Sequence, residues 1–517
     1  MSDDADGSTG LRTLYRASRV HTLSHRANGE WLLVDGRHVE RVGSGPPPAA
    51  DHVVDLPGAT IVPGFIDSHV HLTGTTLSNI GIPIERSRSG DELLGLVAEE
   101  ITHGPSKILA HGFDESRWSD PRLPALTAFD EIGDVPVILV RADGHLSFVN
   151  SVALEKADLW GLDGVERDAA GTPTGVVRRE ANQAIQRWFH QELSDHELRE
   201  LQLQAASMAA SRGVTCVHEM SIPASRGRRD IEVLMEHRQQ LPVDVVPYVA
   251  DKDLPWLMDL GLTTVGGDLS LDGSIGARTA AVDEPYADAS DDGGGTGSLY
   301  EDPDELAELF HNAHLAGMQV AVHAIGDAAI EQALSVWERV YRTLDSRMRR
   351  HFRARRHRVE HFEMPSGHQI ERAAALGLAI SVQPAFDAEW GQAGGMYEWR
   401  LGQHRSDPMN PFVTLQTRGL EVGAGSDSPI TPLDPMHGIW SLEHHHDPAQ
   451  RMDREAAVWL FTTGSARLAH LEDKKGRLGP GMQADFAAYE DDPLTAPDPR
   501  GIRPVLTVSR GRQVYVR

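Results

Sequence analysis

The sequence predicts an α/β fold organised as a (β/α)8 TIM barrel. Three observations carry this prediction. The middle of the chain alternates apolar, strand-like runs with helical patterns, the runs that resemble barrel strands number eight, and both ends consist of short strand-like runs punctuated by Gly and Pro. The barrel strands are expected at residues 61–71, 214–220, 243–250, 268–273, 318–324, 357–362, 378–384 and 420–427.

The length of 517 residues favours more than one domain, because a single ordinary core rarely serves so long a chain. A small β-sandwich is expected from residues 1–62 and 472–517 together, and the barrel from residues 63–471. Within the barrel, residues 75–210 are far longer than a normal strand-to-helix connection. This segment holds strand-like runs and then a long helical pattern, which predicts an inserted α+β subdomain over the barrel mouth.

Composition narrows the classes of partner. The formal net charge of −27 disfavours nucleic acid and anionic membrane surfaces, and the sequence lacks the run of about 18 apolar residues that a membrane span needs. The first ten residues, MSDDADGSTG, lack the basic and apolar regions of a signal peptide. The single cysteine, Cys216, excludes an internal disulfide. These features favour a protein of the reducing cytoplasm.

The motif DSHVH ends the first predicted barrel strand. His69 and His71 are two residues apart, so on a strand both imidazoles point the same way and can chelate a divalent metal. His323, His361 and Asp427 end three later strands of the predicted barrel. Because barrel active sites lie at the carboxyl ends of the strands, these side chains are expected to converge on one metal site at the mouth.

Two other segments are less specific. Residues 291–298, DDGGGTGS, lack the Lys-Ser/Thr ending of a phosphate loop and are expected to form a mobile loop. The run HHH at residues 444–446 is expected to be the polar face of a helix, with adventitious metal binding as the alternative.

The chain resembles the amidohydrolase superfamily, and within it the amidohydrolase-3 (YtcJ-like) branch. The motifs that carry this resemblance include PGFIDSHVHL, RADGHLSFVNSVAL, GTPTGVVRRE, LDGSIGARTA, VHAIGD, HRVEHFE and GSDSPITPLDP. The resemblance implies a metal-dependent barrel with a β-sandwich from the two termini, and hydrolysis of C–N bonds in amides, N-formyl or N-acyl compounds and cyclic amides. A homodimer is a further expectation from the family.

The resemblance also implies roles for individual residues. His69, His71, His323, His361 and Asp427 match the metal ligands, and Asp427 would take a proton from the attacking water and pass it to the leaving nitrogen. Zinc is the expected metal, as one or two ions, although manganese, iron or nickel could substitute.

The motif DLSLDG departs from the family pattern. In many relatives a lysine that bridges two metals precedes this Asp-Gly pair, and here Asp268 occupies the lysine position. Three arrangements stay open. Glu180, a family-like glutamate in the insertion, could bridge two metals, and Asp268 could approach a metal directly or through water. In the third arrangement a single ion is bound by His69, His71, His323 and Asp427, with His361 polarising the substrate.

The family-like candidates for the substrate pocket are His145, Asp272, Arg278 and Gln383. Arg278 could pair with a substrate carboxylate, or with Asp283 or Glu284 as a structural ion pair. Trp390, Tyr397 and Trp399, in the loop after the seventh strand, could form an apolar wall over the site.

Two rival functions stay open. The scaffold could support non-hydrolytic chemistry, such as isomerisation or decarboxylation of a small acid. The missing lysine alternatively favours a metal-poor protein that binds a small molecule.

Overall fold

The computed structural model describes residues 11–24, 27–289 and 295–517. The N-terminal segment 1–10 and residues 291–294 of the loop predicted at residues 291–298 lie outside the described residues. No helix in the described part of the chain is both long and apolar enough to cross a membrane.

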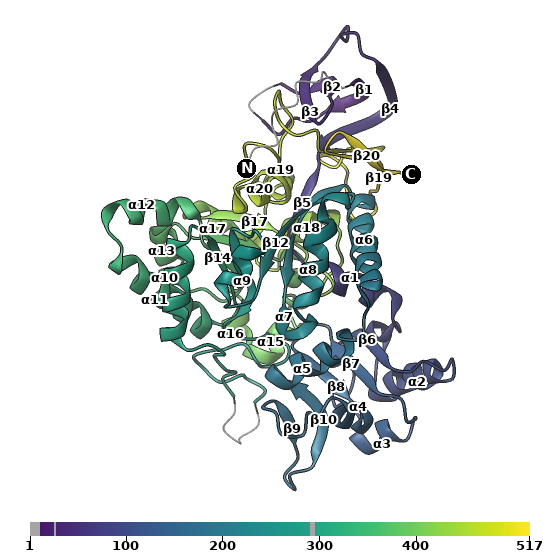
Figure 1. Cartoon of the computed structure of the whole chain (residues 1–517), viewed down its shortest axis with the longest axis vertical. Helices are drawn as coiled ribbons and strands as arrows, with labels where there is room; N and C mark the ends of the chain where they lie inside the picture. The colour runs from purple at the N-terminus through teal and green to yellow at the C-terminus, as the bar shows by residue number, and fades with distance from the viewer. Residues whose placement is uncertain (1–10, 25–26, 290–294) are drawn as a thin grey trace.

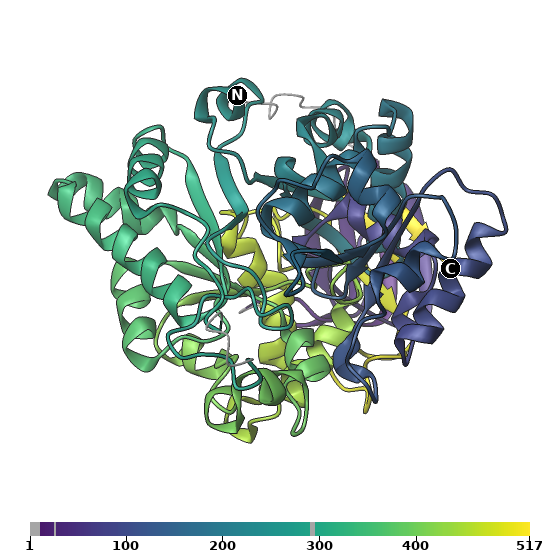
Figure 2. The same cartoon turned by 90° about the horizontal axis from the view of Figure 1, so that it is seen from below.

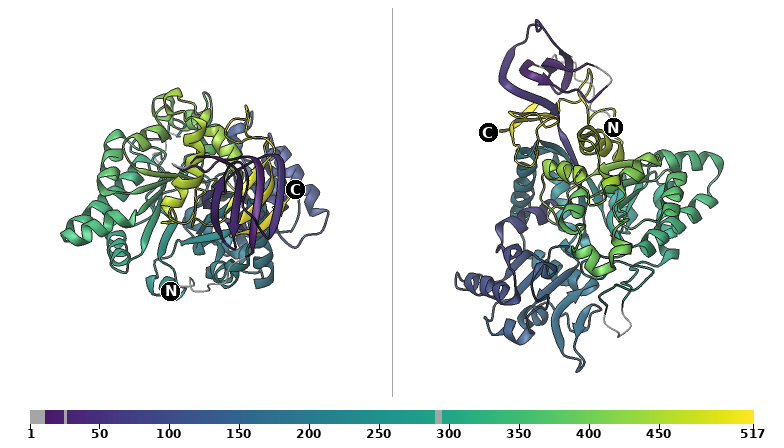
Figure 3. Two further views of the ribbon diagram at one scale, coloured as in Figure 1. Left: turned by 90° about the horizontal axis from the view of Figure 1, so that it is seen from above. Right: turned by 180° about the vertical axis from the view of Figure 1, so that it is seen from behind.

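Strands from both ends of the chain form one seven-stranded sheet (Figure 3). Its order is β20-β19-β18-β4-β1-β2-β3. The strands are β1 (Arg12–Val20), β2 (Gly29–Asp35), β3 (His38–Gly43), β4 (His52–Pro63), β18 (Phe486–Tyr489), β19 (Pro504–Ser509) and β20 (Arg512–Val516). The long β4 pairs with β1 on one side and with β18 on the other. Because β4 pairs with an N-terminal strand on one edge and a C-terminal strand on the other, the seven strands form one continuous sheet. The expected sandwich would have two sheets.

All eight strands predicted for the barrel are present, and each pairs in parallel with its sheet neighbours. They form two hydrogen-bonded sheets, of order β12-β11-β5 and β13-β14-β15-β16-β17. Their bounds are β5 (Phe65–Val70), β11 (Val214–Ser221), β12 (Asp244–Val249), β13 (Thr264–Ser270), β14 (Gln319–Ala324), β15 (Arg358–His361), β16 (Ala379–Val382) and β17 (Glu421–Ala424). The structure therefore shows a mixed α/β fold without a closed eight-stranded ladder.

The two parallel sheets are separated between β12 and β13, which form no hydrogen-bonded ladder with each other. Gly266 and Gly267 have φ of 90° and 80°, values that glycine adopts without the penalty of a side chain. The β13–β14 register shifts between Gly266 and Ser270. A Cβ on Gly267 would lie 2.9 Å from the Cβ of Tyr248 in β12, so the two strands touch there without forming a ladder. On the other side, a single bridge from Val70 to Ser428 links β5 to the segment after β17.

Helices cover the outer faces of the two parallel sheets (Figure 1). The helices of this part of the chain, some of which lie at the strand ends instead, are α1 (Leu72–Ile80), α6 (Asp195–Ser211), α7 (Pro223–Arg226), α8 (Arg228–His237), α9 (Leu254–Asp259), α10 (Pro303–Leu315), α11 (Asp327–Thr343), α12 (Ser346–Arg355), α13 (Gly367–Leu376), α14 (Pro384–Trp390), α15 (Met396–Leu401), α16 (Gln403–Ser406), α17 (Phe412–Thr417), α18 (Pro435–Glu443), α19 (Arg454–Trp459) and α20 (Ser465–Leu468). Apolar residues of the strands and helices share one large core. In it, Trp337 stacks on Phe310 with ring centroids 3.9 Å apart.

A five-stranded sheet lies in the long connection after α1, at the end of the molecule opposite the seven-stranded sheet (Figures 1 and 2). Its order is β6-β7-β8-β10-β9. Its elements are α2 (Gly90–Ile101), β6 (Ile108–Phe113), α3 (Leu126–Asp130), β7 (Val137–Arg141), β8 (Leu146–Val149), α4 (Ser151–Lys156), β9 (Val165–Arg167), β10 (Pro173–Arg178) and α5 (Arg179–His190). The next helix, α6, instead packs against α1 and α8 beside the parallel strands.

Candidate active site

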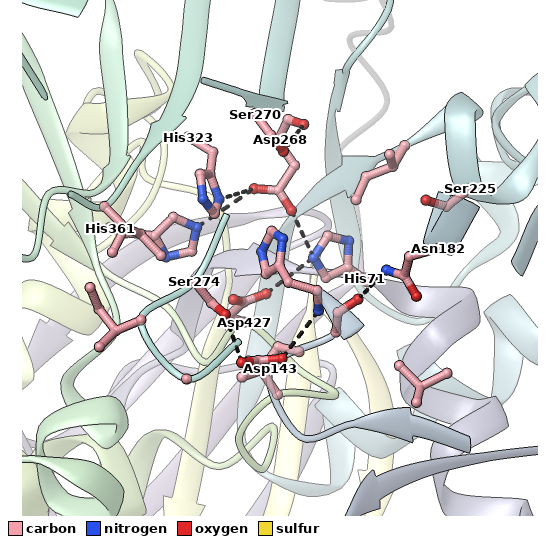
Figure 4. Close-up of a pocket in the computed structure, with 18 of the residues that line it drawn as sticks. His71, Asp143, Asn182, Ser225, Asp268, Ser270, Ser274, His323, His361 and Asp427 are labelled. Carbon is pink, nitrogen blue, oxygen red and sulfur yellow. Dashed lines mark hydrogen bonds and ion pairs between the residues drawn. The ribbon is translucent and has the colours of Figure 1, made fainter. Parts of the chain in front are cut away.

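The carboxyl ends of the parallel strands bring six ligand-type side chains together. Figure 4 labels all of them except His69. None of them is more than 8% exposed. They form two groups, one of His69, His71, Asp268 and Asp427 and the other of Asp268, His323 and His361. Asp268 belongs to both groups, so its carboxylate lies at the junction between them.

Distances around Asp268 show how central it is. Its Oδ2 lies 3.1 Å from Nε2 of His71, and its Oδ1 lies 3.4 Å from Nε2 of His69. The same Oδ1 is 3.5 Å from Nδ1 of His323 and 3.6 Å from Nε2 of His361. The Oδ1 atom of Asp427 completes the first group, 3.4 Å from His69 and 3.1 Å from His71.

Hydrogen bonds fix the outer nitrogens of three of these imidazoles. Nδ1 of His69 donates to Glu360 over 3.0 Å, Nδ1 of His71 donates to the carbonyl of Met220 over 2.7 Å, and Nε2 of His323 donates to the carbonyl of Gly273 over 3.1 Å. Each donation leaves the other nitrogen unprotonated in the neutral ring and directed at the cluster. This arrangement is typical of metal-binding histidines.

The polar atoms at the centre have no hydrogen-bond partner within the described residues. They are Nε2 of His69, both ring nitrogens of His361, Oδ1 of Asp268 and Oδ1 of Asp427. Buried polar atoms are rarely left unpaired, because the lost hydration costs free energy. Imidazole nitrogens and carboxylate oxygens together are the donor set that zinc and similar divalent ions prefer. The residues present therefore fit a metal.

The electrostatics of the cluster agree with this fit. Burial opposes ionisation, but His69 and the neighbouring imidazoles hold the pKa of Asp268 well below its usual range. Burial likewise opposes protonation of His71, but the carboxylates of Asp268 and Asp427 raise its pKa to about 9. Without a metal, protons on the histidines balance the two carboxylates, and a divalent cation would replace them.

The backbone is turned sharply at two of the clustered residues. His361 and Asp427 have φ of 69° and 55°, in the left-handed region that side chains disfavour. Along β15, strand alternation puts Arg358 and Glu360 on one face and would send His361 to the other. The positive φ instead turns His361 toward His69, and their ring centroids lie 4.9 Å apart.

Glu180 does not join the cluster. Its side chain is exposed in the first turn of α5, and it is absent from both groups of ligand atoms. It borders a cleft that Asp268 also reaches from the other side. Asp268, which β13 carries into the cluster, instead lies where the two groups of ligand atoms meet.

Of the four predicted pocket residues, only His145 borders the cavity. His145 borders the cavity beside the cluster, with its ring centroid 5.2 Å from that of His323. Burial and the neighbouring His323 lower its pKa to about 4. Gln383 is buried at the start of α14 and does not border the cavity.

Asp272 is fully buried and also lies outside the cavity lining. It accepts backbone N–H groups from Ala281, Ile325 and Gly326 over 2.9–3.1 Å. These bonds hold the loop after β13 against the end of β14. The structure thus gives Asp272 a scaffolding contact, and its contact with substrate stays a prediction.

Arg278 does not face the cavity either. Its guanidinium forms a two-pronged ion pair with Asp288, over 2.5 and 3.0 Å. The predicted alternative partners, Asp283 and Glu284, are not the ones it uses. Asp288 also binds Arg400 over 2.6 Å, so Arg278 belongs to a charge network behind the pocket wall.

Aromatic residues form part of the pocket wall. Trp390 and Tyr397 border the cavity, whereas Trp399 does not. The indole N–H of Trp390 donates to Asp114 over 3.1 Å, and the hydroxyl of Tyr397 donates to Glu363 over 2.6 Å. Because both polar atoms are engaged, the rings present apolar surface to the cavity.

Sequence reasoning missed two buried charges behind the cluster. Glu360 accepts from Arg358 over 2.8 and 2.9 Å and orients His69. Both residues are fully buried. The pattern RVEH in a strand is a usable signal, since Arg and Glu two residues apart share a face and fully buried charges are rare unless paired.

The HHH run forms a third His/Asp group away from the cavity. Nδ1 of His446 donates to Asp387 over 2.5 Å and Nε2 donates to the carbonyl of Asp407 over 3.0 Å. His445 accepts from the N–H of Asp447 and donates to the carbonyl of Asn410. Every nitrogen of these two rings has a protein partner, so the group has no lone pair to offer an ion.

Comparisons with known proteins agree with this geometry. The chain is 29% identical to the protein YtcJ of Bacillus subtilis (strain 168), over 89% of this chain and 90% of that protein. It is 23% identical to the N-substituted formamide deformylase of Arthrobacter pascens, over 90% of each chain. The solved structure of a metal-dependent hydrolase from Pyrococcus furiosus matches with a TM-score of 0.72 and 26% identity, covering 94% of this chain and all of that one.

A family model described as the amidohydrolase family matches residues 52–515, nearly the whole chain. Because this match takes in the parallel strands, the insertion and strands of the terminal sheet, the chain belongs to the amidohydrolase family.

Proposed function

We propose that this protein is a metal-dependent hydrolase that cleaves a C–N bond of a small molecule, in an amide, an N-formyl or N-acyl compound or a cyclic amide. The observation that carries the proposal is the position of Asp268 between two sets of unpartnered ligand atoms. The formamide deformylase among the relatives supports the C–N bond as the target. Zinc is the first candidate metal, because the site is rich in imidazole.

In this proposal Asp268 replaces the bridging lysine of other family members. His69, His71 and Asp427 would hold one ion with Asp268, and His323 and His361 would hold a second. Bound divalent ions supply Lewis acidity, which polarises the scissile carbonyl and lowers the pKa of the attacking water.

Asp427 is the proposed general base. Its backbone N–H donates to the carbonyl of His69 over 2.7 Å, which anchors the carboxylate beside the histidine pair. Asp67 strengthens this anchor by accepting N–H groups from both His69 and Ser426. A carboxylate held in this way can take a proton from the attacking water and deliver it to the leaving nitrogen.

In the proposed architecture the two parallel sheets surround one active-site opening. We propose that they are two arcs of one barrel, with residues 75–210 inserted over its opening and residues 1–62 and 472–517 forming a separate β domain. The parallel strands run toward the insertion in Figure 1. The candidate ligands lie near or just after the carboxyl ends of these strands, as expected for a barrel enzyme.

A release assay tests the proposal. Protein loaded with zinc is incubated with a panel of N-formyl, N-acyl and cyclic amides, and the freed amine and acid are measured. We expect hydrolysis of at least one compound class, and loss of turnover after chelation. Protein that binds no zinc would contradict the proposal, as would turnover without incorporation of water.

A further inference from the structure

Arg226 on the cavity wall differs from the buried arginines Arg141 and Arg400 in its lack of a carboxylate partner among the described residues. Arg226, at the end of α7, is half-buried and borders the same cavity as the metal cluster. Within the described residues, no carboxylate oxygen forms an ion pair with it at 4.0 Å or less. By contrast, the buried Arg141 and Arg400 each bind carboxylates directly.

Among residues 11–24, 27–289 and 295–517, the one hydrogen bond of the Arg226 guanidinium goes to a neutral acceptor. Its Nη1 donates to Nε2 of His190 over 3.3 Å. Nδ1 of His190 donates to the carbonyl of Gln186, so Nε2 carries the lone pair and the ring is uncharged. Most of the five N–H donors of this arginine are therefore free to bind a ligand.

Nearby carboxylates are occupied elsewhere. Glu219 accepts the N–H of Leu72 over 2.7 Å, and Asp230 accepts the hydroxyl of Thr73 over 2.6 Å and the amide of Gln202 over 2.9 Å. They favour the charge on Arg226 from a distance, but they do not satisfy its donors. A partly buried guanidinium with unsatisfied N–H donors is stabilised most by a planar anion, such as a carboxylate, that accepts two of its hydrogen bonds.

The backbone of α1 makes room for the guanidinium. A Cβ on Gly74 would lie 2.3 Å from Nη2 of Arg226. Gly74 is in the first turn of the helix that begins directly after His71. The absence of a side chain at this position lets the guanidinium lie against α1 on the wall of the cavity that the candidate ligands also border.

Other polar groups surround this position. Nε2 of His111 is buried without a partner, and burial together with the charge of Arg226 lowers the pKa of His111 to about 3. Ser225 and Asn182 also border the cavity, and Figure 4 shows them on one side of the cluster with His323 and His361 on the other. The polar wall thus continues around Arg226.

Other charged side chains on the cavity wall have protein partners: Arg179 pairs with Asp163, Asp143 pairs with Arg141, and Glu363 accepts the hydroxyl of Tyr397. One part of the wall is apolar. It includes Ile275, Ile325, Phe386, Trp390, Met396 and Ile430. These side chains pack in one cluster with the aromatic wall described above. The same cavity is therefore bordered by the guanidinium of Arg226, by an apolar area and by the candidate metal ligands.

We propose that Arg226 is a specificity residue that binds the carboxylate of the substrate, while the apolar wall receives its acyl group. The substrate class is an N-acyl amino acid with an apolar acyl chain. This inference rests on the proposed function, because it assumes that the scissile amide lies at the metal cluster.

A matched pair of ligands tests the inference. N-phenylacetylglycine carries the carboxylate, and its N-methylamide is a neutral analogue of similar shape. With the zinc-loaded protein we expect the acid to have at least about a tenfold higher kcat/KM, from charge-assisted hydrogen bonds to Arg226. Arg226→Gln should remove this preference, and Arg226→Lys should retain part of it.

Two further variants separate charge from position. Gly74→Ala keeps the arginine but pushes its guanidinium aside, so it should also reduce the preference for the acid. Arg187→Gln is the matched control: this arginine of α5 donates to the carbonyl of Ala224 and does not border the cavity. It should leave the ratio between acid and amide unchanged.

The outcomes distinguish this inference from the proposed function. Equal hydrolysis of both ligands, or a preference that survives in both Arg226→Gln and Gly74→Ala, would overturn the role of Arg226 and leave the hydrolase intact. If neither ligand is hydrolysed, calorimetric binding to metal-free protein decides. Tighter binding of the acid that is lost in Arg226→Gln supports the inference, and equal binding of acid and amide overturns it.

Discussion

Asp268 is the residue on which the proposed chemistry depends. The family resemblance leads us to expect a carboxylated lysine at this position, and an aspartate side chain is several bonds shorter. The structure shows how the short side chain still reaches both groups of histidines: it lies within 3.6 Å of a ring nitrogen from His69, His71, His323 and His361. The turn through Gly266 and Gly267 displaces β13 where this is needed.

Asp268→Asn should lower metal content. The amide keeps the size of the side chain but removes the charge that opposes the histidines, so we expect about a 10–100-fold loss of metal affinity. Metal analysis of protein dialysed against limiting zinc measures it. Glu180→Gln is the control and should retain the full metal content, whereas equal losses in both variants would refute the central position of Asp268.

Asp427→Asn should abolish turnover while the fold is retained. Loss of a general base typically costs about 10²–10⁴-fold in rate. The measurement is kcat on the best substrate of the release assay, with circular dichroism to verify the fold. Turnover close to that of the wild type in folded, metal-loaded protein would rule out the role given to Asp427.

At the scale of elements, the HHH run joins α18 to the pocket wall. His446 binds Asp387, which lies on α14 beside Phe386 and close to Trp390 of the cavity. Burial opposes protonation of His446, but the carboxylate of Asp387 raises its pKa above the usual value. The protonated ring therefore stabilises the folded state.

This ion pair predicts a pH-dependent stability. A group whose pKa is raised on folding contributes most below its unfolded pKa, and the contribution is lost as the pH rises through the folded value. His446→Gln should thus lower Tm more at about pH 6 than at about pH 9. His444→Gln, an exposed neighbour in the same run, should show no such difference. A Tm loss in His446→Gln that does not vary with pH would contradict this account.

The parallel strands were predictable from the sequence, because each is a compact apolar run. Most of the ligand cluster was also predictable. The spacing of His69 and His71 and the strand-end positions of His323, His361 and Asp427 indicate from sequence that these side chains meet. The side-chain pairings were not predictable. Arg278 and Arg226 look alike in sequence, and only the tertiary fold gives Asp288 to the first and leaves the second without a carboxylate.

At the scale of the whole molecule, the two chain ends are interdependent. β18 pairs with β4 through residues such as Phe486 and Ala488, and Phe486 packs against Tyr15 of β1 with ring centroids 4.8 Å apart. The hydroxyl of Thr507 in β19 also donates to the carbonyl of Ala210 at the end of α6. The seven-stranded sheet thus connects both termini to the parallel strands.

Deletion of residues 486–517 should prevent normal folding. It leaves the edge of β4 unpaired and exposes the apolar face that Phe486 and Tyr489 cover, which favours aggregation. Soluble yield and Tm measure the effect. A soluble, cooperatively melting protein with an unchanged Tm would show that the terminal sheet is not needed for the rest of the fold.

The most direct test of the account is an anomalous-scattering map of crystals grown with zinc. We predict two peaks, one beside His69, His71 and Asp427 and the other beside His323 and His361, with the carboxylate of Asp268 in contact with both. A single peak that Asp268 does not touch, or a second peak bound by Glu180, would contradict it.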